Sequence, residues 1–165
     1  MDSEPARPVA VRVLSLGNDL LADDGFGFAV AQELKGQIRE DVEIICSPAA
    51  GLALLDTLEG ATHLLVVDTW QAGTGIPGTV YRAEEATFAS ARGPSLHSAG
   101  LMETLALGRR LQMSVPKVVA VVAVEPADCL TVGGPMTPAV RRAVPTAAAL
   151  ARRIVDEWLQ APPAA

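Results

Sequence analysis

The stretch VAVRVLSLGNDLLADDGFGF (residues 9–28) predicts a strand, a tight acidic turn and the start of a helix. Its first eight residues are mostly Val, Leu and Ala, as in strands that are buried on both faces. Phe26 and Val30 then begin an apolar repeat of four residues, which is typical of an amphipathic helix. The turn between the strand and the helix contains the adjacent acids Asp23 and Asp24, framed by Gly17, Gly25 and Gly27. This order of elements is the start of a βαβ unit and favours a parallel sheet.

Further apolar runs of strand length follow along the chain, at 42–47, 63–70 and 117–124. A more mixed run over 78–83 predicts an edge strand. Strands that alternate with helices at this spacing indicate a doubly wound fold. We therefore predict an α/β fold: a single three-layer α/β/α domain with a mostly parallel, twisted sheet of about five strands. The domain is expected to cover residues 1–165, with residues 1–8 and 161–165 frayed.

Helical patterns occupy four segments: 25–39, 51–59, 98–112 and 137–160. Ser95 or Ser98 is a candidate N-cap for the third of these helices. Thr137 and Pro138 suit the cap and first turn of the last helix. Pro145 is expected to break or restart that helix, because proline cannot donate the intrahelical hydrogen bond.

Composition limits the function. Half of the 165 residues are apolar, so a substantial core is expected, and the net charge of −6 argues against partners such as nucleic acid or anionic membranes. No apolar run approaches the ~18–20 residues that span a bilayer, and the N-terminal residues do not resemble a signal peptide, so we expect a cytoplasmic protein. Cys46 and Cys129 are expected to be buried or half-buried thiols without a disulfide, although a thiol nucleophile stays open.

Polar residues follow several predicted strands, at the edge where ligands gather in such folds. Asp23 and Asp24 follow the first strand, Asp68 ends the third, and His97 precedes the helix over 98–112. Two carboxylates and one imidazole suit either a divalent transition metal or general acid–base catalysis. A turn-forming role for Asp68 and an ordinary loop position for His97 remain open.

Structural explanations compete with these functional ones. We expect one of Asp23 and Asp24 to cap the following helix while the other points outward. Glu125 is expected to be a structural turn residue, and His63, with no acid near it in sequence, to be structural or exposed. His97 is then the one imidazole available for this edge. The chain has no H-E-x-x-H, P-loop or G-x-S-x-G motif, and DGFGFAV lacks the third Gly or Ala of a dinucleotide site, so no organic cofactor is expected.

Five segments together resemble the NiFe-hydrogenase maturation endopeptidases. They are, in order, LGNDLLADDGFG (16–27), VVDTWQAG (66–73), SLHSAGL (95–101), AVEP (123–126) and MTPAVRRAVP (136–145). The first is distinctive, and the match spans nearly the whole chain. The resemblance implies a cytoplasmic enzyme that removes a C-terminal extension from the NiFe-hydrogenase large-subunit precursor after nickel insertion. It also implies a twisted sheet between helices.

The resemblance places the metal-contacting and catalytic residues at Asp24, Asp68 and His97. It implies that these side chains bind nickel held by the substrate and so test whether the substrate is loaded. A water activated by the metal or by Asp24 is the expected nucleophile. The glycines around Asp24 are expected to let a bulky substrate tail approach the backbone.

Two other functions stay open. Peptidyl-tRNA hydrolase has a related architecture and shares the LGN sequence, but it needs a basic RNA-binding face that a net charge of −6 does not supply. A non-catalytic nickel chaperone would use the same three side chains to sense metal, and the sequence does not separate it from a protease.

Overall fold

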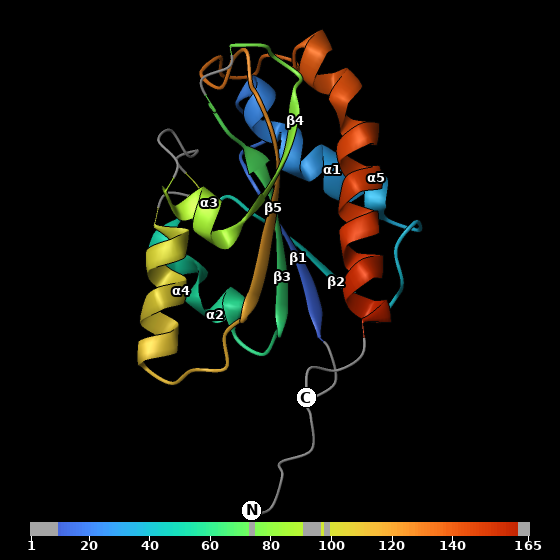
Figure 1. Ribbon diagram of the computed structural model, residues 1–165. Coiled ribbons are helices and arrows are strands. Elements are labelled where there is room, and N and C mark those ends of the chain that lie inside the picture. The colour runs from blue at the N-terminus through green and yellow to red at the C-terminus, as the bar shows by residue number, and fades with distance from the viewer. Residues whose placement is uncertain (1–9, 73–74, 91–96, 98–99, 162–165) are drawn as a thin grey trace, which may run out of the picture.

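Helices cover both faces of a central sheet in the computed structural model (Figure 1). The structure describes residues 10–72, 75–90, 97 and 100–161. Its strands are β1 (Val11–Leu16), β2 (Glu43–Ser47), β3 (His63–Thr69), β4 (Val80–Glu84) and β5 (Val118–Val124). They pair in the order β2-β1-β3-β5-β4, with β4 antiparallel to β5 and the other pairs parallel. The predictions of a mostly parallel sheet and of an edge strand near 78–83 are confirmed.

The helical elements are η1 (Ala22–Gly25), α1 (Phe26–Leu34), η2 (Gly51–Leu54), α2 (Leu55–Leu58), α3 (Glu85–Ser90), α4 (Leu101–Arg110) and α5 (Pro138–Gln160), where η marks a 3-10 turn. Helices α1 and α5 cover one face of the sheet, and α2, α3 and α4 cover the other (Figure 1). Val13 packs beneath α1 and α5, whereas the next residue, Leu14, packs on the opposite side. Because both faces are buried, the central strands read as unbroken apolar runs.

Helix α1 is shorter than its pattern predicts. It ends at Leu34 because Lys35 is extended and Gly36 has a φ of 78°, in the left-handed region. Ile38 still packs against the core from the following turn, which explains why the apolar repeat seemed to continue. The short helix α3 was not predicted from the sequence.

The predicted break at Pro145 is wrong, because α5 continues from Pro138 to Gln160. Pro145 lies on the exposed side of the helix, where water can replace the hydrogen bond that proline cannot donate. Ala147 and Ala151 on the opposite side are fully buried and hold the helix against the sheet. Thr137 is the N-cap residue, with Pro138 in the first turn, as predicted.

The N-cap position of α4 is Gly100, with a φ of 82°, rather than either candidate serine. Ser95 and Ser98 lie outside the described residues, as do 1–9 and 162–165. The extent of the domain and its frayed ends therefore stay predictions. None of the helices in the described part of the chain is long and apolar enough to cross a bilayer.

Candidate active site

The turn after β1 folds back tightly on the end of the strand, and two glycines make this possible. Gly17 has a φ of 143°, and a Cβ there would lie 2.1 Å from the backbone oxygen of Asp24. A Cβ on Gly27 would lie 2.3 Å from the backbone oxygen of Leu16. The prediction that these glycines admit a substrate tail is therefore wrong for Gly17 and Gly27. The chain's own backbone occupies the space that a side chain would need.

Asp23 is a fully buried anchor for the loop before α5. Its carboxylate accepts hydrogen bonds from the backbone N–H groups of Ala127, Asp128 and Thr137, at 2.9, 2.9 and 2.7 Å, and from the Thr137 hydroxyl at 3.0 Å. Four donors compensate the burial of its charge. The prediction that one acid of the pair caps α1 is wrong, because its N-cap is Gly25 and no side chain caps it.

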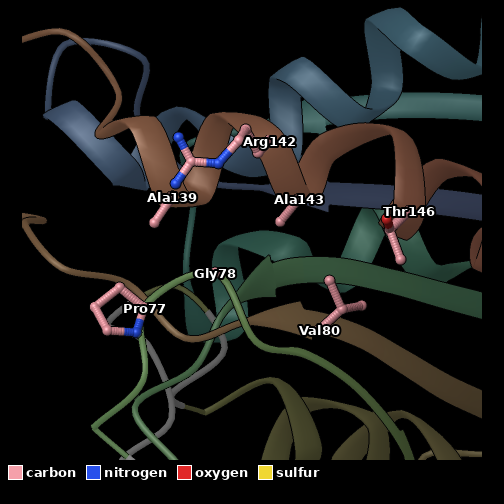
Figure 2. Close-up of a pocket in the computed structure, with 7 residues that line it drawn as sticks. All are labelled: Pro77, Gly78, Val80, Ala139, Arg142, Ala143 and Thr146. Atoms are coloured by element: carbon pink, nitrogen blue, oxygen red, sulfur yellow. The ribbon is translucent and has the colours of Figure 1, made fainter.

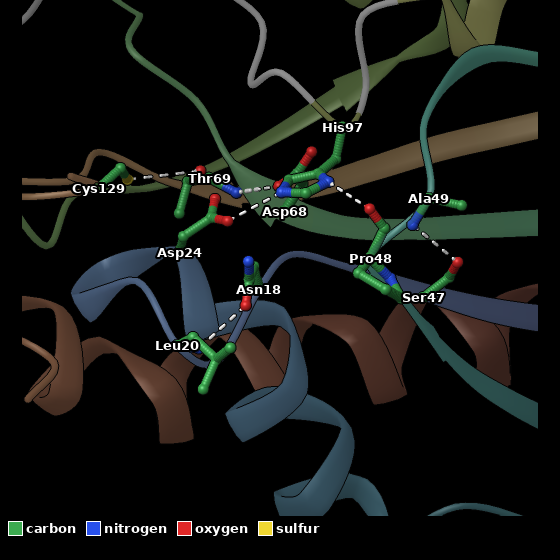
Figure 3. A network of polar contacts seen from close by, with 10 residues as sticks. All are labelled: Asn18, Leu20, Asp24, Ser47, Pro48, Ala49, Asp68, Thr69, His97 and Cys129. Carbon is green, nitrogen blue, oxygen red and sulfur yellow. Dashed lines mark hydrogen bonds and ion pairs between the residues drawn. The ribbon is translucent and has the colours of Figure 1, made fainter. Parts of the chain in front are cut away.

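Asp24 points the other way, toward His97 (Figure 3). Its Oδ2 lies 2.8 Å from Nε2 of His97, and both side chains are largely buried. On the other side of the ring, Nδ1 lies 3.1 Å from the backbone oxygen of Pro48, just after β2. Because each ring nitrogen faces an oxygen acceptor, this arrangement favours the doubly protonated imidazolium. The hydrogen bond with Asp24 is the main cause that raises the pKa of His97; the charges of Asp24 and Asp68 add to it and burial opposes it.

Asp68 completes the predicted trio. It is fully buried near the end of β3, and its Oδ1 accepts a hydrogen bond of 2.7 Å from the backbone N–H of Thr69. Figure 3 shows it beside His97, in agreement with its contribution to the pKa of that ring. β1 and β3 are neighbouring parallel strands, so the residues at their carboxyl ends meet at one edge. The structure thus brings Asp24, Asp68 and His97 to one place from three separate segments.

The three side chains have the donor chemistry of a site for a divalent metal such as nickel, since carboxylate and imidazole are hard to borderline ligands. Pro48 holds Nδ1 and leaves Nε2 directed at the site, as in many metal-binding histidines. Two ligands of one ion at ~2.1 Å lie roughly 3.0–3.4 Å apart, slightly farther than Asp24 and His97. Within the ranges that the structure describes, no three His, Cys, Asp or Glu side chains are grouped closely enough to hold an ion. Sharing one ion would therefore require loss of the Nε2 proton, a small separation of Asp24 from His97, and an approach of Asp68 to this pair.

Cys129 and Thr69 adjoin the site, and neither is among the three site residues predicted from the sequence. Sγ of Cys129 lies 4.0 Å from Oγ1 of Thr69, next to Asp68 (Figure 3). Burial raises the pKa of the Cys129 thiol to about 12, and the nearby aspartates, Asp24 foremost, add to this. The thiol is therefore protonated at neutral pH, which argues against the activated thiol that the sequence left open here.

Both cysteines are free thiols, as predicted. Cys46 is exposed, however, so the expectation that it is buried or half-buried is wrong. It lies on β2, which is an edge strand of the sheet, and so lacks a neighbouring strand on one side. Cys129 is intermediate in exposure, in agreement with the expectation.

Glu125 and His63 have the structural roles expected of them. Oε2 of Glu125 accepts hydrogen bonds from the Ala72 N–H and the Tyr81 hydroxyl, each at 3.0 Å, and so joins the segment after β3 to β4. The ring of His63 packs 5.2 Å from that of Trp158 on α5. These contacts place both side chains in the framework around the sheet.

The hollow drawn in Figure 2 lies between α5 and the start of β4 and contains none of the predicted trio. Its volume is about 470 Å³, and its lining residues are Pro77, Gly78, Val80, Ala139, Arg142, Ala143 and Thr146. Arg142 is the one charged residue among them. This lining offers no pair of acid and base, so the chemistry is assigned to the edge that holds Asp24 and His97.

Comparison with known proteins identifies the family. A family model described as hydrogenase maturation protease matches residues 28–154. The chain belongs to the hydrogenase maturation protease family. The prediction of this family is thus confirmed, as is that of a protease. The matched residues begin after Asp24, so the acidic turn lies outside them, and the roles of the trio stay predictions.

Individual relatives agree. The chain is similar to the hydrogenase expression/formation protein HupD of Bradyrhizobium diazoefficiens, with 33% identity over 153 residues that cover 90% of this chain and 79% of HupD. It is 30% identical over 120 residues to the hydrogenase 2 maturation protease of Escherichia coli, covering 70% of this chain and 73% of that protein. The solved structure of the hydrogenase maturating endopeptidase HybD from E. coli matches with a TM-score of 0.78 and 26% identity, over 90% of this chain and 93% of HybD. The predicted fold is therefore confirmed.

Proposed function

We propose that this protein removes a C-terminal extension from the precursor of a NiFe-hydrogenase large subunit, in the cytoplasm and after nickel insertion. Membership of the maturation protease family supports the protease activity. The observation that carries the nickel-dependent part is the contact between Asp24 and His97 beside the buried Asp68. In this proposal nickel belongs to the substrate, and no organic cofactor takes part.

In this proposal three side chains, those of His97, Asp24 and Asp68, distinguish precursor that contains nickel from precursor that does not. Without nickel, Nε2 of His97 stays protonated and paired with Asp24. When loaded precursor binds, Nε2 would lose its proton to the solvent and contact the nickel of the substrate, while Nδ1–H stays hydrogen-bonded to the Pro48 carbonyl and keeps the ring in place. Asp24 is then freed from the imidazolium. Cleavage thus requires that Nε2 of His97 exchange its contact with Asp24 for one with nickel. Nickel-free precursor cannot cause this exchange.

In this proposal the attacking group is a water molecule, and the raised pKa of the nearby Cys129 thiol argues against attack by that thiol. Asp24 accepts one proton from this water as its oxygen forms a bond to the carbonyl carbon of the scissile peptide. The carbon–nitrogen bond then breaks, and the proton passes from Asp24 to the departing amine. The products are a carboxylic acid at the new C-terminus, which loses its proton to the solvent, and the released extension with a new amino terminus.

The alternative is a nickel-sensing chaperone that uses the same trio without cleaving. The peptidyl-tRNA hydrolase alternative finds no support in the family match or in the net charge of −6. The test is to incubate metal-stripped protein with nickel-loaded precursor and to weigh the products by mass spectrometry. A precursor shortened at its C-terminus supports the proposal. Intact precursor in a stable complex supports the chaperone, and intact, unbound precursor contradicts both.

A further inference from the structure

The most exposed apolar side chains gather at one end of the molecule. Eight large apolar side chains are exposed among the described residues. The five most exposed, at 64–85%, are Leu20, Leu52, Ile76, Leu130 and Val132. They lie in the segments that follow β1, β2, β3 and β5, at the carboxyl edge of the sheet, where the candidate site also lies. We call these five side chains the apolar rim.

Two parts of the rim adjoin the trio directly along the chain. Leu20 lies in the same tight turn as Asp24, four residues before it. Leu52 lies in η2, four residues after Pro48, whose carbonyl holds Nδ1 of His97. The rim and the polar site are therefore built from the same loops.

The part of the rim after β5 is joined to neighbouring backbone by hydrogen bonds. The carboxylate of Asp128 accepts hydrogen bonds of 2.9 and 3.0 Å from the N–H groups of Leu130 and Thr131. Val132 forms a bridge with Leu21 in the turn after β1, and the N–H of Gly133 donates to the Leu20 carbonyl at 2.7 Å. These contacts join the segment that carries Leu130 and Val132 to the turn after β1, and both side chains are exposed.

Single exposed apolar side chains are normal on protein surfaces, but five of the most exposed ones on the loops of one sheet edge favour a surface that another molecule covers. The occupant follows from the site: a polypeptide that presents nickel to Asp24 and His97 must lie across the loops of this edge. We propose that the apolar rim docks an apolar surface of the folded large-subunit precursor. This inference rests on the proposed function and names how the same site recognises its substrate.

The test compares two double variants with the same chemical change. Leu130→Ser with Val132→Ser alters the rim, whereas Leu111→Ser with Val118→Ser alters exposed residues at the opposite end of the sheet. Binding of nickel-free precursor is measured by calorimetry at 0.1 and 0.5 M NaCl. We expect at least tenfold weaker binding for the rim variant, less than twofold for the control, and little effect of salt on the wild type. Circular dichroism and thermal melting check that both variants fold.

Equal affinities for wild type and rim variant would overturn the proposal, as would equal losses in both variants. A wild-type dimer that the rim variant splits would also overturn it, because the occupant would then be a second copy of this chain. Steady-state cleavage of nickel-loaded precursor separates this inference from the proposed function. A raised KM with unchanged kcat in the rim variant supports docking. If the rim variant binds precursor more weakly but the wild type does not cleave it, the proposed function is contradicted and the docking surface is supported. If the wild type cleaves precursor normally but the rim variant binds it as tightly as the wild type does, the docking surface is contradicted and the proposed function is supported.

Discussion

Nε2 of His97 lies 2.8 Å from Oδ2 of Asp24, although 73 residues separate them in the chain. The neighbouring acid, Asp23, faces away and binds the loop before α5. One carboxylate of the adjacent pair thus builds the framework and the other enters the site. Through the contact between Nε2 and Oδ2, the protonation of His97 determines whether the Asp24 carboxylate is paired with the ring or available to another group.

The first prediction concerns these adjacent acids. Asp24→Asn should abolish processing and leave the fold intact, because it removes a group of the site. Asp23→Asn should lower the free energy of unfolding by about 1–3 kcal/mol, since an amide cannot accept all four hydrogen bonds of the buried carboxylate. A domain of ordinary stability survives this loss. Urea unfolding and a cleavage assay measure the two effects, and equal loss of cleavage in two well-folded variants would contradict the division.

The second prediction concerns the two histidines, which titrate in one NMR experiment on metal-free protein. The pKa of His97 should lie above 6.5, raised chiefly by its hydrogen bond with Asp24, and that of His63 below 6.5, lowered by burial. In Asp24→Asn the pKa of His97 should fall. A raised pKa means that the folded state binds the proton more tightly than the unfolded state. The stability from this pair is therefore present below about pH 6.5 and is lost as the pH rises through the folded-state pKa. A His97 that titrates at or below His63 would contradict the geometry.

Topology explains why part of the site was predictable. Asp24 and Asp68 follow neighbouring parallel strands, and the carboxyl ends of such strands meet at one edge. His97 was predicted as a site residue for two reasons. His63, the other histidine, begins a strand at the opposite end of the sheet, and the family resemblance indicates His97. The contact between Asp23 and Thr137 had no local signal, because 114 residues separate them and a buried carboxylate looks like a helix cap in sequence.

The helices show the same limit. Strands buried on both faces were found from their apolar runs alone, but the end of α1 depends on the left-handed Gly36. The continuity of α5 through Pro145 depends on which side of the helix meets the sheet. The end of α1 and the continuity of α5 thus depend on tertiary structure, and local helix propensity cannot predict them.

The third prediction concerns Gly17. Gly17→Ala should lower the free energy of unfolding by about 3 kcal/mol or more, for two reasons. The new Cβ would clash with the backbone oxygen of Asp24, and the φ of 143° at this position is unfavourable for alanine. Gly60→Ala is the matched control, with a φ of 89° and no atom within 4 Å of the new Cβ, and should cost about 1 kcal/mol. Denaturant unfolding compares them. Equal effects would show that backbone conformation alone, and not the close approach to Asp24, requires the glycine.

The fourth prediction concerns Cys129. Cys129→Ala should retain cleavage within about tenfold of wild type, because a thiol with a pKa of about 12 is not the nucleophile. Iodoacetamide at pH 8 should modify the exposed Cys46 well before Cys129, as followed by mass spectrometry of the peptides. Loss of cleavage in a folded Cys129→Ala protein, with rapid alkylation of Cys129 in the wild type, would assign the attack to the thiol.

The most direct test of the central claim, that Asp24, Asp68 and His97 read nickel carried by the substrate, is a pair of crossed cleavage reactions. Nickel-free precursor is mixed with enzyme that has been soaked in nickel and desalted, and nickel-loaded precursor is mixed with metal-stripped enzyme. The product is the shortened precursor, measured by mass spectrometry, with the nickel content of each precursor determined in parallel. We predict cleavage only in the second reaction. Efficient cleavage in the first reaction, with no nickel passing to the precursor, would show a catalytic metal resident in the enzyme and would contradict this account.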